Sequence, residues 1–137
     1  MQAIPAWVGR YVGLPFLPNG RDHRGVDCWG LVRLVLLEQF AIDLPFYHFG
    51  YETCRERKAI GGVVQEVKEA PGWAKVEKPT LSSVVVFKVM GYPCHVGLMV
   101  TEEMFLHSAA GHDSCVESLR SLRWKNRVEG YYQFVAG

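Results

Sequence analysis

Three residues far apart in this sequence have the types that nucleophilic catalysis by a thiol requires. Cys28 stands where a polar loop gives way to a strongly apolar segment, and His95 and His107 lie twelve residues apart in the C-terminal half. A thiolate is the reactive form of cysteine, an imidazole can exchange a proton with it, and a third polar group can orient that imidazole. These types predict a catalytic site built from Cys28 and the two histidines.

The segment that follows Cys28 has the pattern of a buried helix. Asp27 is a suitable N-cap, and residues 28–40 are apolar around almost the whole helical circumference. We therefore predict the central core helix here, ending before Leu44-Pro45. A thiol at its first position meets the positive end of the helix dipole, which lowers the pKa of a cysteine. The predicted nucleophile thus stands on a rigid element.

The remaining patterns predict an α+β domain in which helices come first and an antiparallel sheet second. Residues 5–12 predict a short helix and residues 16–26 an exposed loop, and two more helices are predicted at 53–59 and 63–70. Short β-branched or aromatic runs between turn signals predict strands at 84–87, 95–100, 104–108, 115–118 and 131–135. We expect the sheet to pack on the central helix.

Strand alternation makes a specific prediction about the two histidines. A two-residue turn would pair Leu98 with His107 and place the imidazoles on opposite faces of the sheet. A three-residue turn at 101–103 pairs Gly97 with His107 instead, so that His95 and His107 become diagonal neighbours on one face. Gly97 then leaves room above its strand for the second imidazole. We therefore predict an odd-length turn or a bulge between these strands.

The composition fits a single domain over residues 1–137. The chain is 49% hydrophobic and 21% charged, and its net charge of +1 gives no field that would attract nucleic acid. No apolar run is long enough to span a membrane, and the N-terminus lacks the basic and apolar regions of a signal peptide. We therefore expect synthesis in the cytoplasm. The four cysteines are expected to be reduced thiols, because a chain of this size and apolarity needs no disulfide staples.

Zinc is the alternative to catalysis for some of these side chains. Cys94 and Cys115 could bind a zinc ion together with His95, His107 and His112, since zinc prefers thiolate and imidazole ligands. Adjacent strand residues point to opposite faces, however, so Cys94 and His95 cannot easily reach one ion. We therefore predict no metal and no cofactor.

Three short motifs resemble those of the NlpC-type cell-wall cysteine peptidases, whose fold is a compact form of the papain fold. They are residues 27–32 (Asp-Cys-Trp-Gly-Leu-Val), 95–98 (His-Val-Gly-Leu) and 105–108 (Phe-Leu-His-Ser). The likeness spans most of the chain, from residue 13 to His107 and, more faintly, the aromatic C-terminal strand. It implies that Cys28 is the nucleophile, His95 the general base and His107 the third residue, which orients the base.

The resemblance also implies a substrate and a setting. The substrate is a peptidoglycan stem peptide, typically cleaved at the amide bond between D-glutamate and a diamino acid. The short form without a signal peptide looks most like the branch found in phage and prophage tail modules. Tail proteins are then expected partners, and the protein would act on the cell wall from a tail or virion. Substrate contacts are expected from Asp27, Trp29, Phe16 and His112.

Two positions depart from the family pattern. Phe16 stands where many members have a tyrosine beside the active site, which removes any contribution of that hydroxyl. Ser82-Ser83 replaces a Gly-Asp pair that usually opens the first strand.

Two other functions compete with hydrolysis. One is a structural tail-assembly protein that keeps the fold with little or no turnover. The other is an acyltransferase of the related permuted fold, which is disfavoured because the histidine there precedes the cysteine in the sequence.

Overall fold

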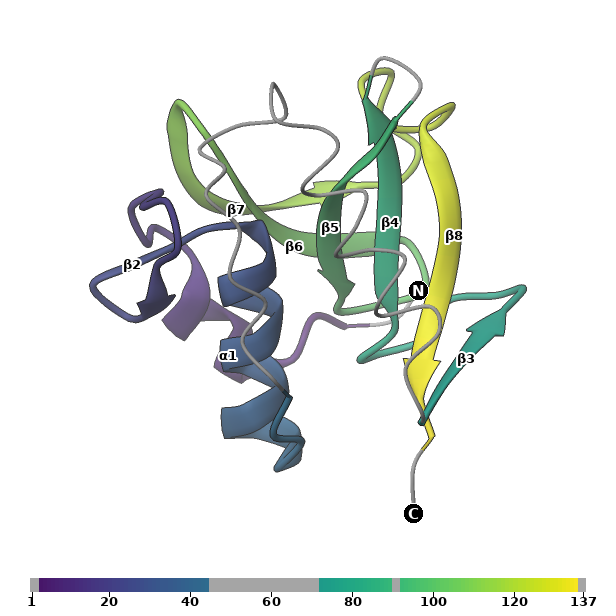
Figure 1. Cartoon of the computed structure of the whole chain (residues 1–137). Helices are drawn as coiled ribbons and strands as arrows, with labels where there is room; N and C mark the ends of the chain where they lie inside the picture. The colour runs from purple at the N-terminus through teal and green to yellow at the C-terminus, as the bar shows by residue number, and fades with distance from the viewer. Residues whose placement is uncertain (1–2, 45–71, 90–91, 136–137) are drawn as a thin grey trace.

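A computed structural model of the chain describes residues 3–44, 72–89 and 92–135 (Figure 1). Within them, one α-helix packs against a six-stranded antiparallel sheet with the strand order β3-β8-β4-β5-β6-β7. The elements in chain order are the 3-10 helix η1 (Ala6–Tyr11), β1 (Arg21–Asp22), β2 (Gly25–Val26), α1 (Cys28–Phe40), β3 (Trp73–Val76), β4 (Val84–Val89), β5 (Tyr92–Met99), β6 (Met104–Ala109), β7 (His112–Ser118) and β8 (Val128–Phe134). The predicted α+β architecture, with an antiparallel sheet on one helix, is confirmed.

Helix α1 occupies the residues that the apolar pattern predicts. Asp27 is its N-cap, and Ala41 ends it in the left-handed conformation with a φ of 55°. Every residue from Cys28 to Leu36 is buried, so the helix is covered on all sides over its first turns. The one charged residue in that stretch, Arg33, donates a hydrogen bond to the carbonyl of Leu44 at 2.7 Å. A helix that is apolar all round thus lies in the core, as its composition requires.

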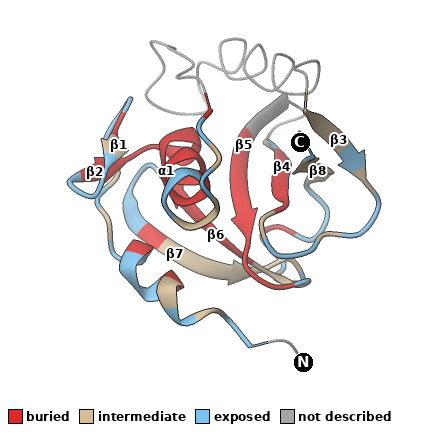
Figure 2. Cartoon of the chain, turned by 90° about the horizontal axis from the view of Figure 1, so that it is seen from below, coloured by how far each residue is buried: buried red, intermediate tan, exposed pale blue. Residues whose placement is uncertain are grey.

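The sheet has a separate core on each face, because side chains alternate along every strand. The cluster around α1 includes Val96, Leu98 and Leu106, and α1 packs against β5 and β6. We call the second group, formed by Val85, Phe87, Met99, Phe105 and Trp124, the aromatic cluster. Figure 2 shows buried residues concentrated in α1, β4, β5 and β6.

Some predicted elements need correction. The expected exposed loop at 16–26 contains the hairpin β1–β2, and Gly20, Gly25 and Val26 in it are buried. The reason is a close approach to α1, since a Cβ on Gly30 would lie 1.9 Å from the carbonyl oxygen of Gly20. Strand β3 was not predicted. The helices predicted at 53–59 and 63–70 lie outside the described residues.

In the part of the chain that the structure describes, no helix has both the length and the apolarity needed to cross a membrane.

Candidate active site

Cys28 is the first residue of α1, and Asp27 holds the backbone around it. The Asp27 carboxylate is fully buried and accepts hydrogen bonds from the N–H groups of Gly30 at 2.6 Å and Asn19 at 3.0 Å. The Cys28 side chain is present as a thiol and is 5% exposed. The sulfur therefore sits at the positive end of the helix dipole, in a segment fixed from both sides.

The turn between β5 and β6 sets the register of the two histidines. Leu98 pairs with Leu106, and the N–H of Val100 donates to the carbonyl of Met104 at 2.9 Å. Residues 101–103 are left as a three-residue turn. The predicted odd-length turn is confirmed.

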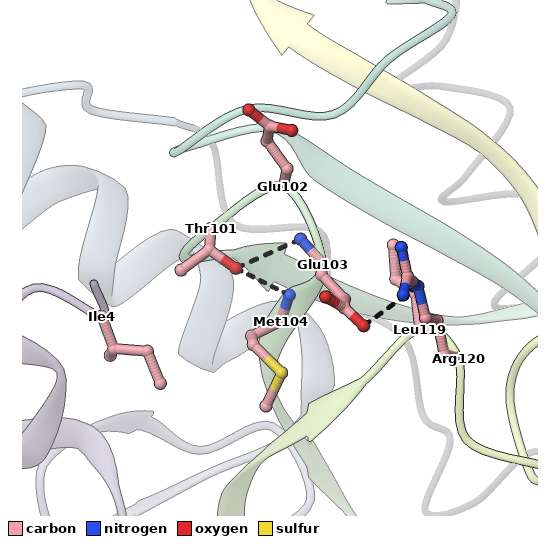
Figure 3. Close-up of a pocket in the computed structure, with 7 residues that line it drawn as sticks. All are labelled: Ile4, Thr101, Glu102, Glu103, Met104, Leu119 and Arg120. Atoms are coloured by element: carbon pink, nitrogen blue, oxygen red, sulfur yellow. Dashed lines mark hydrogen bonds and ion pairs between the residues drawn. The ribbon is translucent and has the colours of Figure 1, made fainter. Parts of the chain in front are cut away.

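Figure 3 shows what stabilises this turn. The hydroxyl oxygen of Thr101 accepts hydrogen bonds from the N–H groups of Glu103 at 3.1 Å and Met104 at 2.9 Å. The turn borders a pocket of about 590 Å³, lined by Ile4, Thr101, Glu102, Glu103, Met104, Leu119 and Arg120. None of the predicted catalytic residues is among them, so this pocket is separate from the candidate site.

The register places Gly97 opposite His107. A Cβ on Gly97 would lie 3.0 Å from Cδ2 of Phe105, 3.2 Å from the carbonyl oxygen of Leu106 and 3.4 Å from Cβ of His107. Glycine therefore allows Phe105 and β6 at Leu106 and His107 to approach this strand closely. The room that the sequence predicts for the imidazole of His107 itself stays a prediction.

His95, His107 and Glu117 form a continuous chain of hydrogen bonds. Nε2 of His95 lies 2.8 Å from Nδ1 of His107, and Nε2 of His107 lies 2.5 Å from Oε2 of Glu117. Both imidazoles are buried, and the Glu117 side chain is 26% exposed. The predicted contact between the two histidines is confirmed, and a carboxylate extends it.

The aromatic cluster covers this chain of side chains. Trp124 stacks on His95 with a ring separation of 5.3 Å and meets His107 edge-on at the same separation. Its indole N–H donates to Oε2 of Glu117 at 3.1 Å. Trp124 therefore orients the carboxylate and shields both imidazoles from water.

Burial and hydrogen bonding shift the pKa values of all three groups. For Glu117, burial raises the pKa, but the donors His107 and Trp124 outweigh it, so the net pKa is lowered and the carboxylate is ionised. For His107, burial lowers the pKa more than Glu117 raises it. For His95, burial and then the neighbouring His107 hold the pKa well below its usual range. Both imidazoles are therefore neutral at pH 7.

These protonation states define the direction of the hydrogen bonds. An ionised carboxylate only accepts, so Nε2 of His107 carries the hydrogen that it donates to Glu117. Nδ1 of the neutral His107 is then an acceptor, and Nε2 of His95 donates to it. Nδ1 of His95 is left without a hydrogen, which is the state that a base requires.

Cys28 and the two histidines belong to opposite faces of the sheet. The Ser108 hydroxyl, next to His107, donates to the carbonyl of Val26 at 3.2 Å, which ties β6 to the segment that enters α1. Cys28 itself belongs to the core around α1, whereas His95 packs in the aromatic cluster. The pairing of Cys28 with His95 stays a prediction.

The expected substrate contacts are distributed unevenly. Asp27 and Trp29 are buried, so neither offers a surface to a substrate in the free protein. Phe16 is half-buried and bridges to Val26, and His112 is exposed, with its ring 6.3 Å from that of His107. Only the last two have the exposure that such a contact needs.

Sequence reasoning missed Glu117 and Trp124. The alternation of β7 was a usable signal for the first, because Cys115 pairs with His107 and Glu117 lies two residues further on the same face. Trp124 follows β7 in a segment of turns and carried no comparable signal.

The comparison with protein families identifies the kind of domain. Residues 13–133 match the NlpC/P60 family, which is most of the chain. This chain belongs to the NlpC/P60 family. The family assignment agrees with the expected NlpC-type resemblance.

Curated relatives of this NlpC/P60 chain are named as endopeptidases. It is 24% identical over 115 residues to the murein DD-endopeptidase MepS/murein LD-carboxypeptidase of Escherichia coli K12, covering 84% of this chain and 53% of the relative. It is 26% identical over 116 residues to a probable endopeptidase of Haemophilus influenzae, covering 83% and 62%. The chain thus spans between half and two thirds of these relatives.

Solved structures show the same fold. An NlpC/P60 family protein from Bacillus cereus superposes with a TM-score of 0.67 at 17% identity, over 92% of this chain and 37% of the other. The NlpC/P60 domain of the peptidoglycan hydrolase SagA superposes with a TM-score of 0.60 at 20% identity, over 96% and 94%.

Proposed function

We propose that this NlpC/P60 chain is a cysteine peptidase that hydrolyses amide bonds in peptidoglycan stem peptides. The observation that carries the proposal is the buried chain of hydrogen bonds from His95 through His107 to Glu117, which leaves Nδ1 of His95 as a base. The name of the Escherichia coli relative, a murein endopeptidase, supplies the substrate class.

In the first half of the reaction, Cys28 is the nucleophile. Nδ1 of His95 takes the proton of the thiol, and the sulfur attacks the carbonyl carbon of the amide. The backbone at the start of α1 provides positive potential for the oxyanion. His107 and Glu117 stabilise the imidazolium that His95 becomes, since proton gain at Nδ1 strengthens the bond that Nε2 donates.

In the second half, His95 returns the proton to the leaving amine, and the C–N bond breaks to leave a thioester on Cys28. Neutral His95 then removes a proton from water, which attacks the thioester. The carboxylic acid leaves, and the thiol is restored.

The finer proposal concerns the bond and the setting. The motifs around Cys28, His95 and His107 resemble those of enzymes that cleave between D-glutamate and a diamino acid, and the phage tail setting comes from the same resemblance. We extend both expectations to this chain.

Digestion of defined muropeptides tests the reaction and the bond together. The panel holds monomers with the D-glutamate–diamino acid bond, D,D-cross-linked dimers and tetrapeptides with a C-terminal L,D bond. New termini are identified by mass spectrometry. We expect cleavage between D-glutamate and the diamino acid, and cleavage at another amide bond would keep the peptidase but replace its specificity.

The control variants separate catalysis from folding. Cys28→Ala should release no product, whereas Cys115→Ala, a second thiol in the same domain, should still cleave. Undiminished release by Cys28→Ala would overturn the nucleophile. No release by the native chain on any substrate would favour the structural tail-assembly protein.

A further inference from the structure

We propose that His107, Cys115 and Glu117 form a binding site for a thiol-seeking divalent cation, Zn²⁺ above all, and that the bound ion switches the peptidase off. The binding part stands on geometry alone, whereas the inhibitory part rests on the proposed function.

The three donor atoms already lie close together. Sγ of Cys115 is 3.7 Å from Nε2 of His107 and 4.0 Å from Oε2 of Glu117, and all three atoms fall within 4.8 Å of one another. In a tetrahedral zinc site with bonds of about 2.0–2.3 Å, neighbouring ligand atoms lie roughly 3.3–3.8 Å apart. The His107–Glu117 separation of 2.5 Å has to widen and the Cys115–Glu117 separation of 4.0 Å has to shorten slightly. Both changes involve the partly exposed Glu117 side chain, which can rotate.

The sheet holds these donors on one face by its register. Cys115 on β7 pairs with His107 on β6, and Glu117 follows two residues later on the same strand. Cross-strand partners and i, i+2 neighbours share a face, so the arrangement needs no rearrangement of the backbone. It shares only His107 and Cys115 with the zinc set considered from the sequence and adds Glu117.

The donor types suit zinc. Imidazole nitrogen, thiolate sulfur and carboxylate oxygen are its usual ligands, and three protein ligands leave one position for water. Cys115 and Glu117 are partly exposed, so an ion can enter from solvent. Two of the donors are also oriented by further hydrogen bonds, since Nδ1 of His107 faces His95 and the indole of Trp124 donates to Glu117.

A bound ion would reverse the hydrogen bonds on which the base depends. The ion occupies Nε2 of His107 in place of its hydrogen, which moves to Nδ1, while the Cys115 thiol releases its proton to solvent. Nδ1 of His107 then donates to Nε2 of His95, so the hydrogen of neutral His95 must sit on Nδ1. His95 can no longer accept the Cys28 proton without placing two hydrogens between the imidazoles.

Cobalt binding tests the site without using activity. Co²⁺ is titrated into the reduced full chain, and the thiolate-to-cobalt charge-transfer band is followed in Cys115→Ser and Cys28→Ser, each checked for native circular dichroism. We expect one equivalent to give the band in the native chain and in Cys28→Ser, and the band to be lost in Cys115→Ser. A band that survives in Cys115→Ser, or no band in the native chain, would overturn the site.

Zinc inhibition tests the consequence. Each protein's hydrolysis rate in Zn²⁺ is compared with its own rate in chelator. We expect the native chain to be inhibited reversibly and Cys115→Ser to lose that inhibition. Equal inhibition of both proteins would mean that the inhibitory ion binds elsewhere, which would overturn the proposed switch. Whether the ion binds at His107, Cys115 and Glu117 is decided by the cobalt titration. If cobalt binds but no form hydrolyses any substrate, the site stands and the proposed function fails.

Discussion

His107 hydrogen-bonds on both of its ring nitrogens, which makes it the centre of the candidate site. Its Nδ1 faces His95 and its Nε2 faces Glu117. A change in the charge of the Glu117 carboxylate therefore alters the basicity of His95 through two successive hydrogen bonds. Glu117 therefore extends the pair of histidines expected from the sequence to a chain of three groups. That Cys28 joins this chain through His95 stays a prediction. Glu117 touches no substrate in this account and acts as a positioning residue.

Glu117→Gln tests this role at the residue scale. The amide oxygen still accepts from His107, but the charge that stabilises the imidazolium is lost. The difference between a charge-assisted and a neutral hydrogen bond is roughly 1–1.5 kcal/mol, so kcat should fall about 10-fold while KM changes little. Steady-state kinetics on the cleaved muropeptide measure both constants.

Glu103→Gln is the matched control. Glu103 is partly exposed and pairs with Arg120 at 3.1 Å, beside the turn and away from the imidazoles. The kcat and KM of the Glu103→Gln variant should therefore match those of the native chain. A Glu117→Gln enzyme with native kcat would contradict the positioning role.

At the scale of the elements, the turn after β5 and the glycine opposite His107 act together. The three-residue turn sets which strand positions face each other. Gly97 on β5 leaves room for Phe105 and His107, which lie two residues apart on β6. Both neighbours are buried, and Phe105 is held by Phe87 at a ring separation of 4.8 Å. A methyl group added at position 97 would therefore press against buried neighbours that have little room to move.

Gly97→Ala should therefore weaken both stability and activity. Overpacking costs about 1–3 kcal/mol, which outweighs the smaller gain of about 0.4–1 kcal/mol from a stiffer unfolded chain. Urea unfolding measures the stability, and hydrolysis should fall because His107 is displaced from His95. Gly9→Ala is the control, since a Cβ at exposed Gly9 meets nothing within 4 Å. A Gly97→Ala protein as stable and active as Gly9→Ala would refute the packing argument.

Sequence patterns predicted these elements to different degrees. The helix at 28–40 was predictable because its apolar residues leave no polar face. The His95–His107 contact was predictable because strand alternation and turn length determine which side chains share a face. The hairpin β1–β2 was not, since its charged residues follow the pattern of a loop and its burial comes from the approach of Gly20 to Gly30. Glu117 was missed because its role depends on a partner on another strand.

At the scale of the whole molecule, two buried neutral imidazoles couple folding to pH. Histidine in the unfolded chain has a pKa of about 6.5, and burial lowers the pKa of His95 and His107 in the folded protein. Below pH 6.5 the unfolded state then binds more protons than the folded state. The free energy of unfolding should therefore fall as the pH drops from 6.5 towards 5.

Urea unfolding at several pH values in chelator measures this slope. His95→Gln removes one titrating group and should flatten the curve in this window. If the free energy of unfolding falls only near pH 4.5, where Glu117 takes up its proton in the unfolded chain, the histidines do not contribute to the pH dependence of stability.

The central claim is that Cys28 and His95 work as nucleophile and base although they pack in different cores. The most direct test is the rate at which iodoacetamide alkylates Cys28 as a function of pH, read by peptide mapping in the native chain and in His95→Ala. The shape of each pH profile reports the base, because a change in access scales the alkylation rate by the same factor at every pH. We expect native Cys28 to react well below the usual thiol pKa of about 8.5, and the His95→Ala rate to recover only as the pH approaches that value. Equal rates in the two proteins at every pH would contradict the account.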